Sequence, residues 1–290
     1  MSDNKPRIAF CFSWQARTLD QTYLFFQKNL FDAAKEQWFD YDVFCAVEDD
    51  EDVDKVKLLN PTKVEKIKSS EIEKIIEEKY GDFIRTAFKT KYKWAYYTYE
   101  WVVRYLQQIY KVSRSIKLCG NYEKYNIIVR LRFDTIFINK FNYNQILKDL
   151  NQGSTIICND EEKHSIWWKI CYSTWEIQDF FFFWDNISMK KLWNIFDKFE
   201  ECFLWHEVKP FFKPIYIVSN RFAILFRFFK IPTLPLEFWA YMIFIAEKCY
   251  YEYFLYNKIH VLKKIISIMI LKHDIKTSYV RLEWKSDIEL

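Results

Sequence analysis

The sequence predicts an α/β protein built on a largely parallel β-sheet. Short apolar runs of strand length alternate with longer segments whose apolar residues recur at helical spacing, in the order strand, helix, strand, strand, helix, helix, strand. The chain has 290 residues, of which 51% are hydrophobic, so it can bury a substantial core. No internal repeat or low-complexity linker interrupts it, which favours one catalytic-type domain over residues 1–203 with a more helical region, residues 204–290, packed on it.

The first eighty residues hold the first three expected strands and two expected helices. Residues 7–13 (RIAFCFS) form a short apolar run behind Pro6, which is typical of a buried strand. The segment 18–35 has apolar residues at helical spacing, and Ser70 is in the position of an N-cap for the second helix. The other elements of this part are strands over 41–47 (YDVFCAV) and 62–68 and a helix over 71–80.

A long helix and one further strand follow. The helix is expected over 86–111, where Trp94, Trp101 and Tyr105 recur on one face. Residues 126–133 (NIIVRLRF) then form the next strand. Because strands that alternate with helices usually run parallel, these elements predict a sheet flanked by helices.

Charge and composition exclude several classes of protein. Lys and Arg number 43 against 39 Asp and Glu, a net charge of +4 that is too balanced for a dedicated nucleic-acid-binding protein. With only 3 glycines, far apart, the chain has neither a G-x-G-x-x-G turn nor a Walker A loop. Its 7 cysteines never form C-x-x-C and the start lacks a secretory signal pattern, so we expect a cytoplasmic protein with reduced thiols. No apolar run reaches 18 residues, so we expect that the protein does not span a membrane.

The strand over 126–133 carries charge where an internal parallel strand is expected to be apolar. Arg130, Arg132 and Asp134 are two residues apart, so they share one face. Burying an ion without a partner is costly, so these charges need each other or a polar ligand. In open α/β sheets, ligands bind at the carboxyl ends of strands, which is where Asp134 lies. The alternative is an edge strand whose wet face holds an ordinary Arg–Asp pair.

Two further segments place polar groups where a ligand could bind. The first expected strand runs into Ser13, Gln15 and Arg17, whose hydroxyl, amide and guanidinium suit a base, a ribose or a diphosphate. The alternative for these three is a polar loop that caps the following helix. Asp179 directly precedes five aromatic residues, 180–184, which indicates either a helix cap or a carboxylate at the edge of a pocket. A carboxylate at a pocket edge would serve as general base or bind an acceptor hydroxyl.

Four short segments, taken in order, resemble nucleotide-sugar glycosyltransferases of lipopolysaccharide and capsule biosynthesis, including their WavE-like members. The segments are 13–17 (SWQAR), 41–44 (YDVF), 124–134 (KYNIIVRLRFD) and 177–184 (IQDFFFFW), and the resemblance spans about residues 8–196. The chain departs from the family pattern at Trp14 and Trp184, where glycine is usual, and at Asn126, where aspartate is usual. The resemblance implies a GT-A-like fold, with a Rossmann-type, mostly parallel sheet flanked by helices and a helical C-terminal part.

The same resemblance implies transfer of a sugar from a nucleotide-sugar donor to a carbohydrate acceptor, either lipid-linked or part of a surface polysaccharide. It assigns the donor to Ser13, Gln15, Arg17, Arg130 and Arg132, a divalent cation (Mn²⁺ or Mg²⁺) to Asp134, and catalysis to Asp134 and Asp179. Many GT-A enzymes hold the metal with an Asp-x-Asp pair, whereas residues 132–134 (RFD) keep one carboxylate. Arg17 and Arg132 could therefore supply the positive charge instead. The alternative function is a non-catalytic nucleotide- or carbohydrate-binding protein.

Two C-terminal segments are both basic and apolar. Residues 205–235 and 258–276 are expected to form core helices with cationic edges, and the alternative is a face that contacts an anionic membrane peripherally. The acidic run 48–54 is expected to be a solvated loop. The 4 histidines have no metal-type spacing, so nothing in the sequence supports a histidine metal site.

Overall fold

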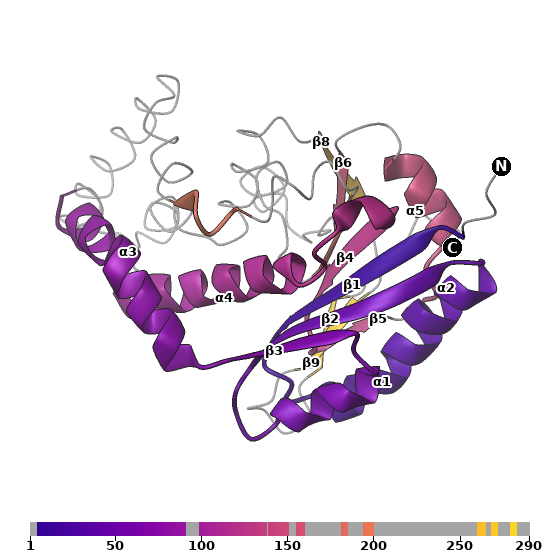
Figure 1. The fold of residues 1–290 in the computed structure, drawn as a ribbon, viewed down its shortest axis with the longest axis horizontal. Helices are drawn as coiled ribbons and strands as arrows, with labels where there is room; N and C mark the ends of the chain where they lie inside the picture. The colour runs from indigo at the N-terminus through magenta and orange to yellow at the C-terminus, as the bar shows by residue number, and fades with distance from the viewer. Residues whose placement is uncertain are drawn as a thin grey trace, which may run out of the picture.

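The structure, a computed structural model, describes residues 5–90, 99–137, 139–150, 155–159, 181–184, 194–199, 260–264, 268–271 and 279–282. Within these residues, seven strands form a main sheet and three form a second, antiparallel sheet. Most neighbouring pairs in the main sheet are parallel, and helices flank it (Figure 1). The predicted α/β class, a Rossmann-type sheet that is mostly parallel, is confirmed.

The main sheet has the strand order β3-β2-β1-β4-β7-β6-β8. Its parallel half comprises β1 (Arg7–Trp14), β2 (Asp40–Glu48), β3 (Lys63–Ile67) and β4 (Ile127–Leu131). The other half consists of β7 (Phe181–Trp184), antiparallel to β4, then β6 (Thr155–Asn159), antiparallel to β7, and β8 (His260–Lys264), parallel to β6. All four predicted strands form. The strand predicted over 126–133 is shorter than expected because the chain turns at residues 133–134.

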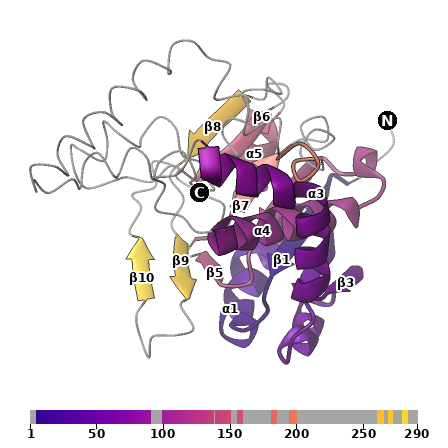
Figure 2. The same ribbon diagram turned by 90° about the vertical axis from the view of Figure 1, so that its left-hand side faces the viewer.

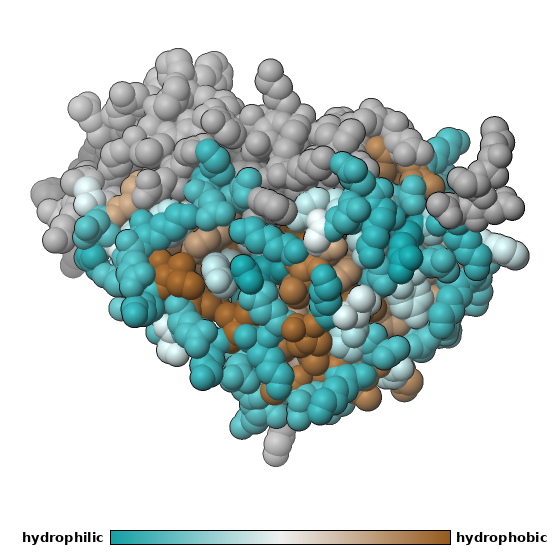
Figure 3. Space-filling model, in the orientation of Figure 1, coloured by the Kyte–Doolittle hydropathy of each residue, from teal (hydrophilic) through white to brown (hydrophobic). Residues whose placement is uncertain are grey.

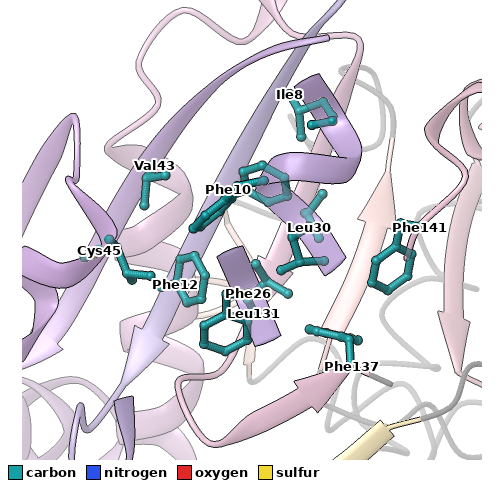
Figure 4. Close-up of a cluster of buried hydrophobic side chains, with 14 of the residues drawn as sticks. Ile8, Phe10, Phe12, Phe26, Leu30, Val43, Cys45, Leu131, Phe137 and Phe141 are labelled. Atoms are coloured by element: carbon teal, nitrogen blue, oxygen red, sulfur yellow. The ribbon is translucent and has the colours of Figure 1, made fainter. Parts of the chain in front are cut away.

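One face of the parallel half is covered by a helical segment that runs almost without interruption from residue 19 to residue 36. It consists of α1 (Leu19–Phe26), a π-helical stretch (Gln27–Phe31) and α2 (Asp32–Glu36), as predicted for 18–35. The core beneath it is rich in aromatic rings (Figure 4). The ring centre of Phe10 lies 5.2 Å from that of Phe31, and Phe12 lies 5.2 Å from Phe26, both edge to face. Such pairs stabilise the core beyond the burial of their area.

The opposite face of the sheet is covered by two longer helices, α3 (Ser69–Thr90) and α4 (Tyr99–Lys117). Leu106, Ile109 and Val112 of α4 pack in one apolar cluster with Ala9 and Cys11 of β1. Figure 2 shows α4 lying across the sheet beside α3. The helix predicted over 71–80 is thus longer than expected, and the helix predicted over 86–111 is divided between α3 and α4, with residues 91–98 outside the described residues.

The remaining described elements are short. They are two 3₁₀ helices, η2 (Val53–Leu59) and η3 (Tyr122–Lys124), the helix α5 (Tyr143–Leu150) and the strands of the second sheet, β5 (Thr135–Phe137), β9 (Ile268–Leu271) and β10 (Tyr279–Leu282). β9 lies between β5 and β10. The turn after β4 therefore leads the chain from the main sheet directly into the second sheet.

The C-terminal region contains strands where helices were predicted. Within 258–276, which was expected to be a core helix, His260–Lys264 and Ile268–Leu271 are strands, and β8 pairs with β6 in the main sheet. A short apolar run fits a buried strand and a helix equally well by periodicity alone, which is why the prediction was wrong here. An amphipathic helix resting on a membrane is therefore not formed by these residues. The segment 205–235 lies outside the described residues.

The described surface gives no sign of a membrane-spanning helix. Of the helices in the described part of the chain, none is both long and apolar enough to cross a bilayer. The coloured part of the face seen in Figure 3 is largely hydrophilic, with apolar residues between the polar ones.

An ionic cluster centred on the largely buried Asp42 holds the amino-terminal edge of the sheet together. Its carboxylate accepts hydrogen bonds from Nε and Nη2 of Arg7, both at 3.0 Å, and from the hydroxyl of Tyr125 at 2.6 Å. Lys124 adds an ion pair at 3.3 Å. Burial alone would raise the pKa of Asp42, but these hydrogen bonds outweigh it and lower the pKa to about 2. Asp42, part of the 41–44 motif, thus joins β1, β2 and the segment before β4.

Replacing Asp42 with asparagine is expected to lower the free energy of unfolding at pH 7 by about 2 kcal/mol. Since the pKa of Asp42 is depressed in the folded state, its contribution is complete above the unfolded pKa of about 3.9 and disappears as the pH falls through about 2. Urea denaturation from pH 7 to pH 2 should show the two proteins converging in acid. Asp40→Asn, which removes an exposed carboxylate 3.9 Å from Lys5, is the control and should change little. A constant difference at every pH would contradict the account.

Candidate functional site

The carboxyl edge of the parallel strands is the place where the topology predicts a ligand site. From β1 the chain adds β2 and then β3 on one side, and β4 lies on the other side of β1. In open α/β sheets the crevice at such a reversal of strand order, outside the carboxyl ends of the strands, is the usual ligand site. Trp14 ends β1, and Arg132 and Asp134 follow the end of β4. Two of the sequence motifs therefore meet at the reversal point.

Arg132 and Asp134 form a two-pronged ion pair at this edge. Nε of Arg132 donates to Oδ1 of Asp134 at 2.9 Å, and Nη2 donates to Oδ2 at 2.5 Å. Each side chain is 15% exposed, so the pair is largely covered. The paired geometry fixes the plane of the guanidinium and occupies both carboxylate oxygens.

Arg130 lies inside β4, two residues before Arg132. It pairs with Cys11 of β1 and Phe182 of β7, and its side chain has no exposed surface. Ile128 packs in the cluster beneath α4, whereas Val129 and Leu131 pack on the opposite side, so the predicted alternation of these apolar residues is confirmed. The donor-binding role of Arg130 stays a prediction.

Trp14 has an unusual backbone and two cations over its ring. Its φ is 120°, in the region that side chains other than glycine rarely adopt. Cζ of Arg132 and Nζ of Lys111 each lie 5.4 Å from the ring centre. A ring at this distance attracts a cation, so Trp14 contacts one side chain from the end of β4 and one from α4.

Lys111 and Glu48 form the second ion pair of this edge. Nζ of Lys111 donates to Oε2 of Glu48 at 2.6 Å, and only 3% of the Lys111 side chain is exposed. The Ser69 hydroxyl donates to Oε1 of Glu48, and Gln15 also bonds to this carboxylate. Burial would raise the pKa of Glu48, but the hydrogen bonds from Lys111, Ser69 and Gln15 outweigh it and lower the pKa.

Several buried polar atoms near this edge have no hydrogen-bond partner among the described residues. They are Oγ of Ser13, Oγ1 of Thr18, Oδ2 of Asp50, Nε2 of Gln108 and Oγ1 of Thr135. Ser13 and Thr18 belong to the end of β1 and the loop after it, Asp50 follows β2, and Thr135 follows the turn after β4. Gln108 lies one helical turn before Lys111 on α4. Since buried polar groups are normally bonded to protein, to ordered water or to a ligand, this set marks where water or a ligand can bind at this edge.

The structure brings several of the predicted site residues to this edge. The predicted donor-binding residues Ser13, Gln15 and Arg132 lie there, and so does Asp134, the predicted metal ligand. Arg17 is exposed, and its carbonyl accepts from Nζ of Lys55 at 2.8 Å. Asp179 lies outside the described residues.

Sequence reasoning missed Glu48 and Lys111. The acidic run 48–54 was expected to be a solvated loop, yet Glu48 is the last residue of β2 and Val53 begins η2. The position of Glu48 at the end of a predicted strand was the available signal. For Lys111 the available signal was its position one helical turn from Gln108, which places two polar side chains together on a helix with many apolar residues.

The structure describes few free oxygen ligands for a divalent cation at this edge, because Asp134 and Glu48 are paired and Asp50 alone has an unpartnered carboxylate oxygen. Mn²⁺ and Mg²⁺ need oxygen ligands. Both oxygens of Asp134 accept from Arg132, and Glu48 accepts from Lys111 and Ser69. Within the described ranges there is no group of three or more His, Cys, Asp or Glu side chains that could hold a metal. The metal-ligand role of Asp134 therefore stays a prediction without a described site.

Comparison with known proteins finds distant similarity only. No family model and no curated protein matches the chain. Solved structures similar to it include the apo form of mouse xyloside xylosyltransferase 1, at 11% identity and a TM-score of 0.35, covering 66% of this chain and 71% of that one. The galactosyltransferase LgtC, in complex with donor and acceptor sugar analogs, is 11% identical with a TM-score of 0.33, covering 64% of this chain and 59% of that one.

A third similar structure is the apo form of the bifunctional glycosyltransferase WbbM. It is 10% identical, with a TM-score of 0.32, and the match covers 68% of this chain and 34% of that one. The chain thus spans less than two thirds of LgtC and of WbbM. TM-scores below 0.5 do not establish a common fold, so the roles of individual residues rest on the geometry of this chain.

Proposed function

We propose that this chain is a glycosyltransferase that moves a sugar from a nucleotide-sugar donor to a carbohydrate acceptor. The observation that carries the proposal is the carboxyl edge of β1 and β4, where Arg132, Lys111 and unpartnered buried polar groups gather at the reversal of strand order. This is where doubly wound sheets bind nucleotides. The order of the sequence motifs, 13–17 before 124–134, supports the same proposal.

The chemistry of transfer explains why cations belong at this edge. When the sugar leaves a nucleotide-sugar donor, negative charge develops on the departing nucleoside diphosphate. Positive groups that are already in place stabilise that charge at the transition state. Arg132, with its plane fixed by Asp134, is the residue that we assign to the diphosphate. Ser13 and Gln15, at the end of β1, are assigned to the donor as well.

The nucleoside end of the donor is assigned to the loops after β1 and β2. Oδ2 of Asp50 is buried without a partner among the described residues, so it suits a ribose hydroxyl, which can donate to it. Burial raises the pKa of Asp50, and the nearby charges of Glu48 and Asp52 raise it further, while the charge of Arg17 opposes them. Asp179 remains the proposed general base or acceptor ligand.

A thermal-shift screen tests the proposal. Nucleotide-sugars and nucleoside diphosphates that bind only the folded protein should raise its apparent Tm, by mass action, as their concentration rises. Release of nucleoside diphosphate from one nucleotide-sugar, accelerated by a carbohydrate acceptor, should follow. Binding without any such release would favour the non-catalytic binding protein. If no nucleotide or nucleotide-sugar shifts the Tm, the proposed function is wrong.

A further inference from the structure

The side chains beneath α4 at the carboxyl edge are mostly hydrogen-bond donors. Arg132 and Lys111 are cations, and a cation cannot accept a hydrogen bond. The neutral members, Ser13 with its Oγ and Gln108 with its Nε2, each have a buried donor group without a partner among the described residues. Ser13 points to the same face of the sheet as Cys11, which packs against α4. Donors in such excess complement a ligand that only accepts, such as a diphosphate.

Two of the three carboxylates described at this edge, Asp134 and Glu48, are each paired with a cation. Asp134 bonds to Arg132 through both of its oxygens, and Glu48 bonds to Lys111. A metal ion that bound to Asp134 or Glu48 would compete with one of these pairs, and a buried cation left without its carboxylate destabilises the folded protein. The pairs therefore favour a role in which the carboxylates hold Arg132 and Lys111 in place for a ligand over a role in which the carboxylates bind a metal.

Trp14 contacts both cations of this edge. Both cations lie 5.4 Å from the centre of its ring, and each has its own carboxylate. The ring is presented by a backbone at φ 120°, which is strained for a bulky residue. Strain of this kind persists where the surrounding structure imposes it, and it concentrates at ligand sites.

From these contacts we infer that Arg132 and Lys111, held against Trp14 and assisted by Ser13 and Gln108, bind the diphosphate of the donor without a divalent cation. The inference rests on the proposed function and specifies how that site neutralises its ligand. Asp134 and Glu48 act through the cations that they hold, so they are positioning residues. Charge-assisted bonds from Arg and Lys to phosphate oxygens supply the positive charge that a metal would otherwise provide.

Calorimetry separates the inference from the proposed function. Uridine, guanosine, adenosine and cytidine diphosphates are each titrated into the full chain, once with EDTA and once with Mn²⁺. At least one of them is expected to bind in EDTA, with Mn²⁺ changing its Kd by less than about threefold. Binding that requires Mn²⁺ overturns the inference and leaves the proposed function standing. Absence of binding under both conditions overturns both.

Ser13→Ala supplies a second test, in which the stability of the ligand-free protein should rise while its affinity for the nucleoside diphosphate falls. Removing a buried hydroxyl without a partner should raise the Tm of the ligand-free protein by about 2 °C, because the desolvation cost disappears. The same change should weaken nucleoside diphosphate binding in EDTA by roughly three- to tenfold, because one donor to the ligand is lost.

The matched control is Ser115→Ala on α4. Ser115 is also fully buried, but its Oγ donates to the carbonyl of Val112 at 2.8 Å. This variant should lower the Tm or leave it unchanged, and its affinity for the nucleoside diphosphate should equal that of the wild type. If Ser13→Ala leaves the affinity unchanged, or lowers the Tm as a merely structural serine would, the placement of the diphosphate beneath α4 is wrong.

Discussion

Arg132→Met is expected to weaken nucleoside diphosphate binding by roughly 10- to 100-fold, the effect of losing one or two charge-assisted hydrogen bonds. The guanidinium is held in one plane by Asp134 and lies against Trp14, so it is already oriented when the ligand arrives. Methionine keeps most of the length and apolar volume of arginine but provides no donor. Calorimetry in EDTA, with the same nucleoside diphosphate for both proteins, measures the change.

Two further variants make the result on Arg132 specific. Arg85→Met removes an arginine of α3 that also bonds to carboxylates, Glu77 and Asp82, and so changes the net charge by the same amount. It should leave the affinity unchanged. Arg132→Lys keeps the charge but loses the planar guanidinium with its several donors. Its affinity for the nucleoside diphosphate should lie between those of the wild type and Arg132→Met. Equal losses in Arg85→Met and Arg132→Met would show that only overall charge matters.

Lys111→Met is expected to give the largest loss of stability, about 3 kcal/mol of unfolding free energy. The ammonium is almost fully buried and pairs with Glu48 at 2.6 Å, so the variant leaves a partly buried carboxylate without its cation. The pKa of Glu48 is lowered in the folded protein, so the stabilisation is complete above the unfolded carboxyl pKa of about 4.3 and is lost in acid. Urea denaturation at pH 7 and pH 4 should show a smaller difference in acid.

The double variant Lys111→Met with Glu48→Gln separates the structural role of Lys111 from its proposed binding role. Removing both charges should recover most of the stability, because no uncompensated ion remains. Affinity for the nucleoside diphosphate should nevertheless stay roughly tenfold below that of the wild type, because one cation of the site is gone. Recovery of the full affinity together with the stability would contradict the assignment of Lys111 to the ligand.

The sequence was sufficient to predict the parallel half of the sheet and one side of the site. Strand-length apolar runs predicted β1 to β4, and the alternation along residues 128–131 predicted which apolar side chains share a face. These features are local, since each strand and each alternation can be recognised within about ten residues. The carboxyl ends of β1 and β4 follow from the strand pattern and the known behaviour of parallel sheets.

The other side of the site depends on packing between distant segments. Lys111 belongs to the candidate site because α4 lies across β1, and Glu48 belongs to it because β2 ends beside β1. Neither contact can be recognised from a local sequence pattern. The C-terminal strands were missed for a related reason. The runs 260–264 and 268–271 become strands by pairing with residues more than a hundred positions earlier, β6 and β5, and their periodicity alone also fits a helix.

A crystal structure with a bound nucleoside diphosphate would test the central claim most directly. We expect phosphate oxygens within about 3 Å of the Arg132 guanidinium, outside the carboxyl ends of β1 and β4 and beneath α4. A nucleotide found elsewhere, for example at the opposite edge beside Asp42, would contradict it.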